Sequence, residues 1–145
     1  MKHRMAVSVL SLIGFFVAFY LLLWKIGVLG ELACSTSGCE TVQTSAYSDF
    51  LGVPVALYGV VGFVTLFVVS LIGLQPNWVE RREPTVLLTA FSGIGVVFAT
   101  YLTYLEASVI HAWCQWCVAS AIIIAAVFAF SLAGLLTWQA SKIAA

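Results

Sequence analysis

Four long apolar stretches without a charged residue constrain the fold of this chain more than any other feature. They cover residues 5–24, 54–74, 85–105 and 113–138, and none contains Asp, Glu, Lys or Arg. A helix needs about 20 apolar residues to cross a hydrocarbon core. Backbone groups find no water in lipid, so segments of this length must be helical. The sequence therefore predicts an all-α, integral membrane four-helix bundle that forms a single domain over residues 1–145.

Composition supports a membrane protein rather than a soluble domain. The chain has 145 residues, of which 63% are hydrophobic and 8% charged, with a mean hydropathy of +1.11. Soluble domains carry about 25% charged residues. We expect lipid around the helices and no nucleic-acid partner. A transporter or channel would usually carry ionisable groups within its spans, and these spans have none.

The distribution of basic residues predicts how the helices are oriented. Lys and Arg concentrate on the cytoplasmic side of membrane proteins. Both termini are therefore predicted to be cytoplasmic, and the loops 25–53 and 106–112 to face outward. Only Lys25 lies on the outward side. The other five basic residues are Lys2, Arg4, Arg81, Arg82 and Lys142.

Two pairs of cysteines fall in the outward regions. Cys34 and Cys39 lie in a polar loop that is predicted to form a lid, and Cys114 and Cys117 lie at the start of the fourth span. Disulfides persist in extracytoplasmic compartments, and a two-residue spacing favours an activated first thiol. The free amides and macrodipole of a helix start lower the pKa of a thiol in the first turn. The pattern predicts a thiol–disulfide redox site with Cys114 as the better nucleophile.

Cys117 is expected to lie deeper than Cys114. It heads a column of small residues with a spacing of four, and such columns let transmembrane helices approach closely. We therefore expect Cys117 to face the bundle interior, where a hydrophobic redox partner could reach it. The column consists of Cys117, Ala121, Ala125, Ala129 and Ala133.

Other interpretations of the cysteines and their neighbours stay open. Four cysteines could bind zinc or form two structural disulfides. Zinc is disfavoured because the helix pair is embedded beside Trp113 and Trp116, and no metal site is predicted. A structural disulfide is disfavoured because the helix already holds both ends of this pair. His111 could accept a proton from Cys114 or lie solvated at the interface, and Glu106 is expected to snorkel to the interface.

The order of these motifs resembles the vitamin K epoxide reductase family over nearly the whole chain. Unrelated four-helix thiol oxidases of bacteria place the closely spaced cysteine pair in the first outward loop, whereas here it comes last. The matching parts are Cys34 and Cys39, Ser45, Gly52-Val53-Pro54, Tyr58-Gly59 and Cys114-Gln115-Trp116-Cys117.

The resemblance implies a role for each cysteine and a membrane quinone as the electron acceptor. Cys117 would face the quinone, and Cys114 would be its resolving partner. Cys39 would relay electrons from Cys34, which would meet a thioredoxin-like protein. The quinone would be of the menaquinone, ubiquinone or phylloquinone type.

Six residues are candidates for binding the quinone. Ser45 and Tyr58 follow from the resemblance alone. Trp113 and Trp116 could line the quinone site or belong to the aromatic belt at the membrane surface. Animal members of the family have a quinone-binding Asn and Tyr where this chain has Val55 and Ala121, so epoxide reduction is not expected. The six candidates are Ser45, Tyr58, His111, Trp113, Trp116 and Ala121.

The sequence therefore predicts a multi-pass thiol oxidase of a prokaryotic inner membrane. It would reoxidise an extracytoplasmic thioredoxin-like protein and pass the electrons to the quinone, which supports disulfide bond formation. The partner is expected to act in trans, because the chain ends at Ala145 without the fused thioredoxin-like domain of many microbial members. Electron flow from the cytoplasm would need a thiol at the inner face, and no cysteine is predicted there. The alternatives are a quinone or quinone-epoxide reductase that uses other thiols, and a non-enzymatic membrane protein with structural disulfides.

Overall fold

Four long helices dominate the structure, a computed structural model that describes residues 1–35 and 37–145. Within these residues, four helices are long and apolar enough to cross a membrane, which confirms the predicted four-helix membrane bundle. Hydrogen bonds within each helix satisfy its backbone, so lipid can surround it. The four are α1 (Lys2–Lys25), α3 (Val55–Leu74), α4 (Glu83–Leu105) and α5 (Gln115–Ala144).

Three of the helices continue beyond the apolar stretches. α1 begins at Lys2 and α5 ends at Ala144. A π-helix, η2 (Glu106–Ile110), continues α4, so most of the expected second outward loop is helical. Hydropathy shows where a segment becomes apolar, whereas a helix ends where its backbone hydrogen bonds end.

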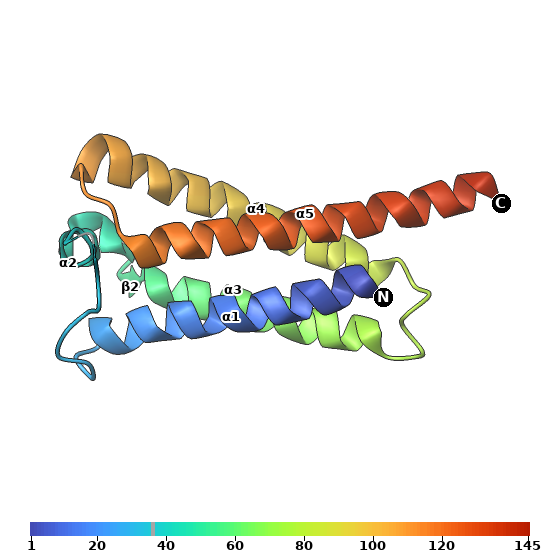
Figure 1. Cartoon of the computed structure of the whole chain (residues 1–145), viewed down its shortest axis with the longest axis horizontal. Coiled ribbons are helices and arrows are strands. Elements are labelled where there is room, and N and C mark those ends of the chain that lie inside the picture. Colours follow the sequence, from blue (N-terminus) through green and yellow to red (C-terminus); the bar gives the residue numbers. More distant parts are fainter. Residues whose placement is uncertain (36) are drawn as a thin grey trace.

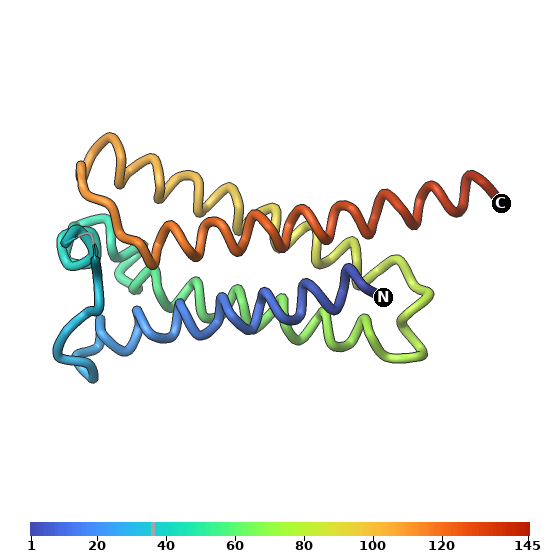
Figure 2. The backbone as a smooth tube through the Cα atoms, in the orientation of Figure 1, coloured from blue at the N-terminus to red at the C-terminus, as the bar shows by residue number. Residues whose placement is uncertain are grey.

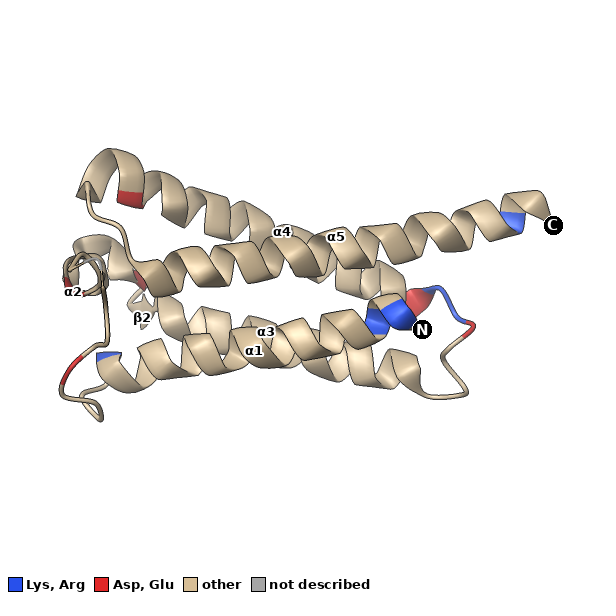
Figure 3. Cartoon of the chain, in the orientation of Figure 1, with Lys and Arg blue, Asp and Glu red and all other residues tan. Residues whose placement is uncertain are grey.

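The four helices run side by side, and the two ends of the bundle differ (Figure 1). α1 packs along α3 and α5, and α4 packs along α5, with both termini at one end and α2 at the other. Charged residues gather towards the two ends, and the long middle parts of the helices carry none (Figure 3). Apolar side chains from all four helices fill the centre of the bundle. The buried members of this core are Val7, Ala18, Phe63, Leu66, Leu88, Ile124 and Val127.

Arg4 ties together the end of the bundle that carries the termini. It precedes the first apolar stretch, yet it lies in the first turn of α1 and is only 8% exposed. Its guanidinium donates hydrogen bonds to the hydroxyl of Thr85 and to three backbone oxygens. These oxygens belong to Gly73, Trp78 and Arg81. A buried charge needs such partners, and they fix the connection between α3 and α4 against α1.

The connection between α1 and α3 folds over the opposite end of the bundle (Figure 2). Leu51 and Gly52 turn between two short antiparallel strands with φ angles of 55° and 78°. A two-residue hairpin turn favours such left-handed pairs. In the part of the chain that is described, this hairpin is the one departure from the all-α prediction. The elements of the connection are α2 (Cys39–Thr44), the 3₁₀ helix η1 (Ala46–Ser48), β1 (Asp49–Phe50) and β2 (Val53–Pro54).

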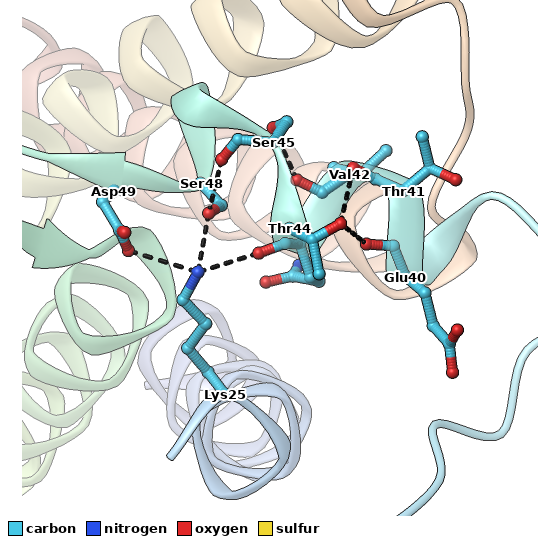
Figure 4. A network of polar contacts seen from close by, with 9 residues as sticks. Lys25, Glu40, Thr41, Val42, Thr44, Ser45, Ser48 and Asp49 are labelled. Atoms are coloured by element: carbon cyan, nitrogen blue, oxygen red, sulfur yellow. Dashed lines mark hydrogen bonds and ion pairs between the residues drawn. The ribbon is translucent and has the colours of Figure 1, made fainter. Parts of the chain in front are cut away.

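Lys25 holds this connection in place (Figure 4). Its Nζ donates to the backbone oxygen of Gln43 at 2.8 Å and to Oγ of Ser48 at 2.7 Å. The same atom lies 3.4 Å from Oδ1 of Asp49. Lys25 therefore joins the end of α1 to α2, η1 and β1, which gives a structural reason for a basic residue at this end of the bundle.

Candidate redox site

The loop cysteines form a disulfide. Cys34 and Cys39 are bonded, with 6.2 Å between their Cα atoms, which is within the usual range. Cys39 begins α2 and is fully buried, whereas Cys34 is half-buried. Cys34 is therefore the more accessible sulfur of the loop pair.

The helix cysteines are two thiols with different surroundings. Cys114 is fully buried and is the N-cap of α5. The sequence predicted it in the first turn of this helix, whereas the helix begins one residue later, at Gln115. A hydrogen bond from the Cys117 thiol lowers the pKa of Cys114 to about 7, and the amides of Cys117 and Trp116 add to this effect. The amides at the helix start act as predicted, but the neighbouring thiol has the larger effect. Cys114 can therefore be a thiolate near neutral pH.

Both cysteine pairs belong to one apolar cluster at the end of the bundle that carries α2. Cys39 of the disulfide and Cys114 of the thiol pair are buried members of this cluster, and their partners pack against it. Gly38 makes the approach possible, because a Cβ there would lie 2.5 Å from the backbone oxygen of Trp113. The disulfide and the thiols are thus neighbours, although they are far apart in sequence.

The segment ahead of the disulfide is bound to the start of α5. The backbone oxygen of Ala33 accepts hydrogen bonds from Nε1 of Trp116 at 2.7 Å and from Nε2 of Gln115 at 3.3 Å. Ser35 donates to Oε1 of Gln115 through its amide and its hydroxyl. The Trp116 ring also packs on Tyr20, with 5.1 Å between centroids. These contacts hold the predicted lid on the thiol pair.

An apolar cavity of about 520 Å³ lies beside the thiols, between the four long helices. Of the four cysteines, all of which are described, Cys117 alone lines it. Ligand pockets usually measure about 300–1,000 Å³ and are mostly apolar with a few polar groups. The cavity therefore fits a quinone ring with part of its hydrocarbon chain. The apolar lining includes Phe63, Leu66, Phe98, Leu102 and Ile124.

Gln43 and Glu106 add polar groups to this cavity, and the sequence did not single them out as site residues. Nε2 of Gln43 donates to Sγ of Cys117 at 3.3 Å. Glu106 is 3% exposed, and its Oε2 accepts the amide of Cys114 at 3.3 Å. The expectation that Glu106 snorkels to the interface is wrong, because η2 continues the helix and the carboxyl group binds the start of α5. The sequence feature that could have indicated a role for Glu106 is its position as a single carboxylate eight residues before Cys114.

The residues expected to bind a quinone lie in different places. Tyr58 and Ala121 line the cavity. The other four candidates are not among the described residues that line the cavity. Ser45 instead closes the end of α2, where its hydroxyl donates to the backbone oxygen of Val42 at 2.7 Å. His111 is exposed and has a left-handed φ of 54° where η2 ends.

Trp113 and Trp116 lie at the surface and against the loop rather than in the cavity. Trp113 is 49% exposed, and the indole of Trp116 binds the backbone oxygen of Ala33, just before the disulfide.

A zinc site was the alternative interpretation of the four cysteines. Two of the four sulfurs are joined as the Cys34–Cys39 disulfide and are therefore not thiolate ligands in this structure. Within the described ranges, no group of three or more His, Cys, Asp or Glu residues could hold a metal ion.

The fold and the site together define a class: a multi-pass membrane protein with a loop disulfide, a thiol pair at a helix start and an apolar cavity beside it. Residues 5–132 of the 145-residue chain match the family model described as the vitamin K epoxide reductase family. The chain belongs to this family. Membership supports an oxidoreductase that acts on thiols, in a family that is associated with quinones.

Proposed function

We propose that this protein is a membrane thiol oxidase that reoxidises a thioredoxin-like protein outside the cytoplasm and passes two electrons to a membrane quinone. The observation that carries the proposal is the arrangement of the four sulfurs. A half-buried disulfide meets a thiol pair in one cluster, and one thiol of that pair lines the apolar cavity. Electrons can therefore pass stepwise from an aqueous donor to an acceptor dissolved in lipid.

The first exchange takes place at the loop disulfide. A thiolate of the reduced partner attacks Cys34, the more accessible sulfur, and Cys39 leaves as a thiolate. The second thiol of the partner attacks this mixed disulfide, which frees Cys34 and leaves the partner oxidised. Two electrons and two protons have then moved from the partner to the loop pair.

The second exchange joins the two cysteine pairs. Cys39 attacks Cys114 of a Cys114–Cys117 disulfide, which forms a Cys39–Cys114 bond and releases Cys117. Cys34 then attacks Cys39, which restores the loop disulfide and leaves the helix pair reduced. A loop disulfide with two helix thiols, the pattern of this structure, is the product of this exchange.

The last step closes the disulfide of the helix pair. A quinone bound in the cavity supplies an acceptor for two electrons and two protons. Cys117 faces this acceptor because it lines the cavity, and Gln43 holds its sulfur through the 3.3 Å hydrogen bond. Cys114 closes the disulfide with Cys117, and its pKa of about 7 makes it available as a thiolate.

The orientation that we propose places the cysteines outside the cytoplasm of a prokaryotic cell and both termini inside. Supporting this, the termini lie at the end of the bundle opposite α2, and five of the six Lys and Arg residues precede the first span, follow the last or lie between α3 and α4. Lys25, the sixth, is held by the lid.

Quinone reduction by the purified protein tests the proposed function. The protein in detergent is mixed with reduced thioredoxin and ubiquinone-1, and quinone loss is compared with thioredoxin oxidation. We expect one quinone reduced for each disulfide formed. Failure of the wild type to reduce ubiquinone-1 with either thioredoxin or dithiothreitol would contradict the proposal.

Two variants test the order of the relay. Cys117→Ala should abolish quinone reduction with every donor, because no sulfur would then line the cavity. Cys34→Ala should lose activity with thioredoxin but keep slow activity with dithiothreitol, which can reduce the helix pair directly. An equal loss of dithiothreitol activity in both variants would show that the relay is not ordered in this way.

A further inference from the structure

Glu106 is a buried carboxyl group that touches both the thiol pair and the cavity. Its Oε2 accepts a hydrogen bond from the amide of Cys114 at 3.3 Å, its carboxyl group lies beside the Cys117 thiol, and the residue lines the same cavity as Cys117. Among the described residues, the one ion pair joins Lys25 and Asp49. No cation within ion-pair distance therefore offsets a charge on Glu106.

An unpaired carboxyl group at this depth is costly, which argues for a function. Burial of a carboxylate without a cation is strongly unfavourable, and ionisable groups within a membrane bundle commonly mark proton or substrate pathways. Glu106 is 3% exposed, on the helix that continues α4. The other carboxylates at the end of the bundle that carries the cysteines are exposed, and they are Glu31, Glu40 and Asp49.

Closing the helix disulfide requires that a proton leave the Cys117 thiol inside the bundle. Gln43 contacts this sulfur through an N–H group and cannot accept a proton. Cys39, which α2 brings into the same cluster, is bonded in the disulfide and does not titrate. Cys114 and Glu106 are the titratable groups that meet Cys117. Because Cys114 contributes its own sulfur to the new bond, the carboxylate of Glu106 is the acceptor that remains.

We propose, building on the quinone chemistry proposed above, that Glu106 carries a proton from Cys117 to the quinone. The thiolate of Cys114 bonds to the sulfur of Cys117, and the S–H proton of Cys117 moves to the Glu106 carboxylate. Glu106 gives this proton to a quinone oxygen, and solvent supplies the second proton. The two electrons of the thiol pair reduce the quinone to the hydroquinone, and Glu106 returns to the carboxylate form.

A structural role for Glu106 predicts different results from two substitutions. Glu106→Gln keeps an oxygen for the Cys114 amide and nearly the same volume, but its amide group cannot take up a proton. Glu106→Asp keeps the carboxyl group on a shorter side chain. If proton transfer matters, Asp should recover activity that Gln loses; if only the hydrogen bond to Cys114 matters, Gln should be the better replacement.

Rapid mixing of the fully reduced protein with ubiquinone-1 measures the step in question over a single turnover. General acid–base groups contribute about 10²–10⁴-fold to a rate, so Glu106→Gln should reduce ubiquinone-1 about 100-fold more slowly than the wild type. Glu106→Asp should lie between the two. Glu40→Gln, which removes an exposed carboxylate on α2, should match the wild type. Reduction of the helix disulfide by dithiothreitol should proceed at the wild-type rate in all three variants.

The outcomes separate this inference from the proposed function. Equal rates of ubiquinone-1 reduction in the wild type and Glu106→Gln would overturn the role of Glu106 and leave the thiol oxidase intact. A slow Glu106→Gln variant that dithiothreitol also reduces slowly, or that Glu106→Asp does not improve on, would assign Glu106 a structural role and overturn the inference. Failure of the wild type to reduce ubiquinone-1 would overturn both.

Discussion

At the scale of single residues, the two helix thiols differ because their surroundings differ. Cys114 stands ahead of α5, where the amides of the first turn and the neighbouring thiol stabilise its charged form. Cys117 lies within that first turn and lines the apolar cavity. One sulfur is therefore suited to exchange with the loop disulfide, and the other to meet an apolar acceptor.

The pH dependence of thiolate formation tests this difference. Ultraviolet absorbance of the thiolate in the reduced helix pair should rise as the pH increases through about 7, the value to which the pKa of Cys114 is lowered. Cys117→Ala removes the largest cause, so the midpoint should move to higher pH. Glu40→Gln is the control and should not shift it. A wild-type midpoint near the ordinary thiol pKa of about 8.5 would contradict the interpretation.

At the scale of elements, hydropathy predicts the four spans because lipid accepts no other backbone structure of that length. Which face of a helix turns inward depends on its neighbours. The column of small residues predicted the inward position of Cys117 correctly, since Cys117 and Ala121 line the cavity. Further along α5 the column fails, because Ala125 and Ala129 are exposed, whereas Ile124 and Val127 are buried. The small residue at the contact is on the other helix, since a Cβ on Gly95 of α4 would lie 2.9 Å from Ile124.

The same limit applies to the site. The cysteine pairs are recognisable in the sequence because each spacing is local. Gln43 and Glu106 come close to the helix thiols only because α2 and η2 pack against each other beside Cys114 and Cys117. A pattern in one segment carries no information about that approach.

Replacing Lys25 should loosen the connection over the thiol pair. Lys25→Met removes the hydrogen bonds from Nζ to Gln43 and Ser48, and bonds to charged groups contribute about 1.5–3 kcal/mol each. Water can replace part of these bonds, because the Lys25 side chain is 19% exposed. A net loss of about 2 kcal/mol for the two bonds together would raise the frequency of local opening about thirty-fold. Hydrogen exchange of the amides of residues 43–49 should become faster by this factor.

The matched control for that substitution is Lys142→Met. Lys142 is exposed near the end of α5, at the other end of the bundle, so its loss should leave exchange in residues 43–49 unchanged. Wild-type exchange in Lys25→Met would show that other contacts hold the connection.

At the scale of the whole molecule, the two ends of the bundle have different tasks. The termini and the connection between α3 and α4 lie at one end, and both cysteine pairs lie at the other. The cavity reaches from the thiols into the apolar part of the bundle. Under the proposed function, this arrangement would let an aqueous protein and a lipid-soluble acceptor use one redox centre without contacting each other.

The orientation of the bundle can be tested with single cysteines at the two ends. Glu31 is exposed in the connection after α1, and Gln75 is exposed in the connection after α3, so each can be replaced by cysteine. An impermeant maleimide added to intact cells should label Glu31→Cys, and it should label Gln75→Cys only after permeabilisation. Labelling of Gln75→Cys alone in intact cells would place the redox site in the cytoplasm.

The central claim, that electrons pass between the loop pair and the helix pair, is tested most directly by trapping the bond between them. In Cys117→Ser, the thiolate of Cys114 can attack Cys39 of the loop disulfide, which forms a Cys39–Cys114 bond and releases Cys34. Without Cys117, no second helix thiol can resolve this bond. Iodoacetamide then alkylates the released Cys34 and prevents the reverse reaction.

Peptide mapping under non-reducing conditions identifies the bond that accumulates. We predict a Cys39–Cys114 crosslink with alkylated Cys34 in Cys117→Ser, and no such crosslink in Cys114→Ser treated in the same way. If Cys117→Ser instead contains only the Cys34–Cys39 disulfide and alkylated or free Cys114, the two pairs do not exchange and the relay is contradicted.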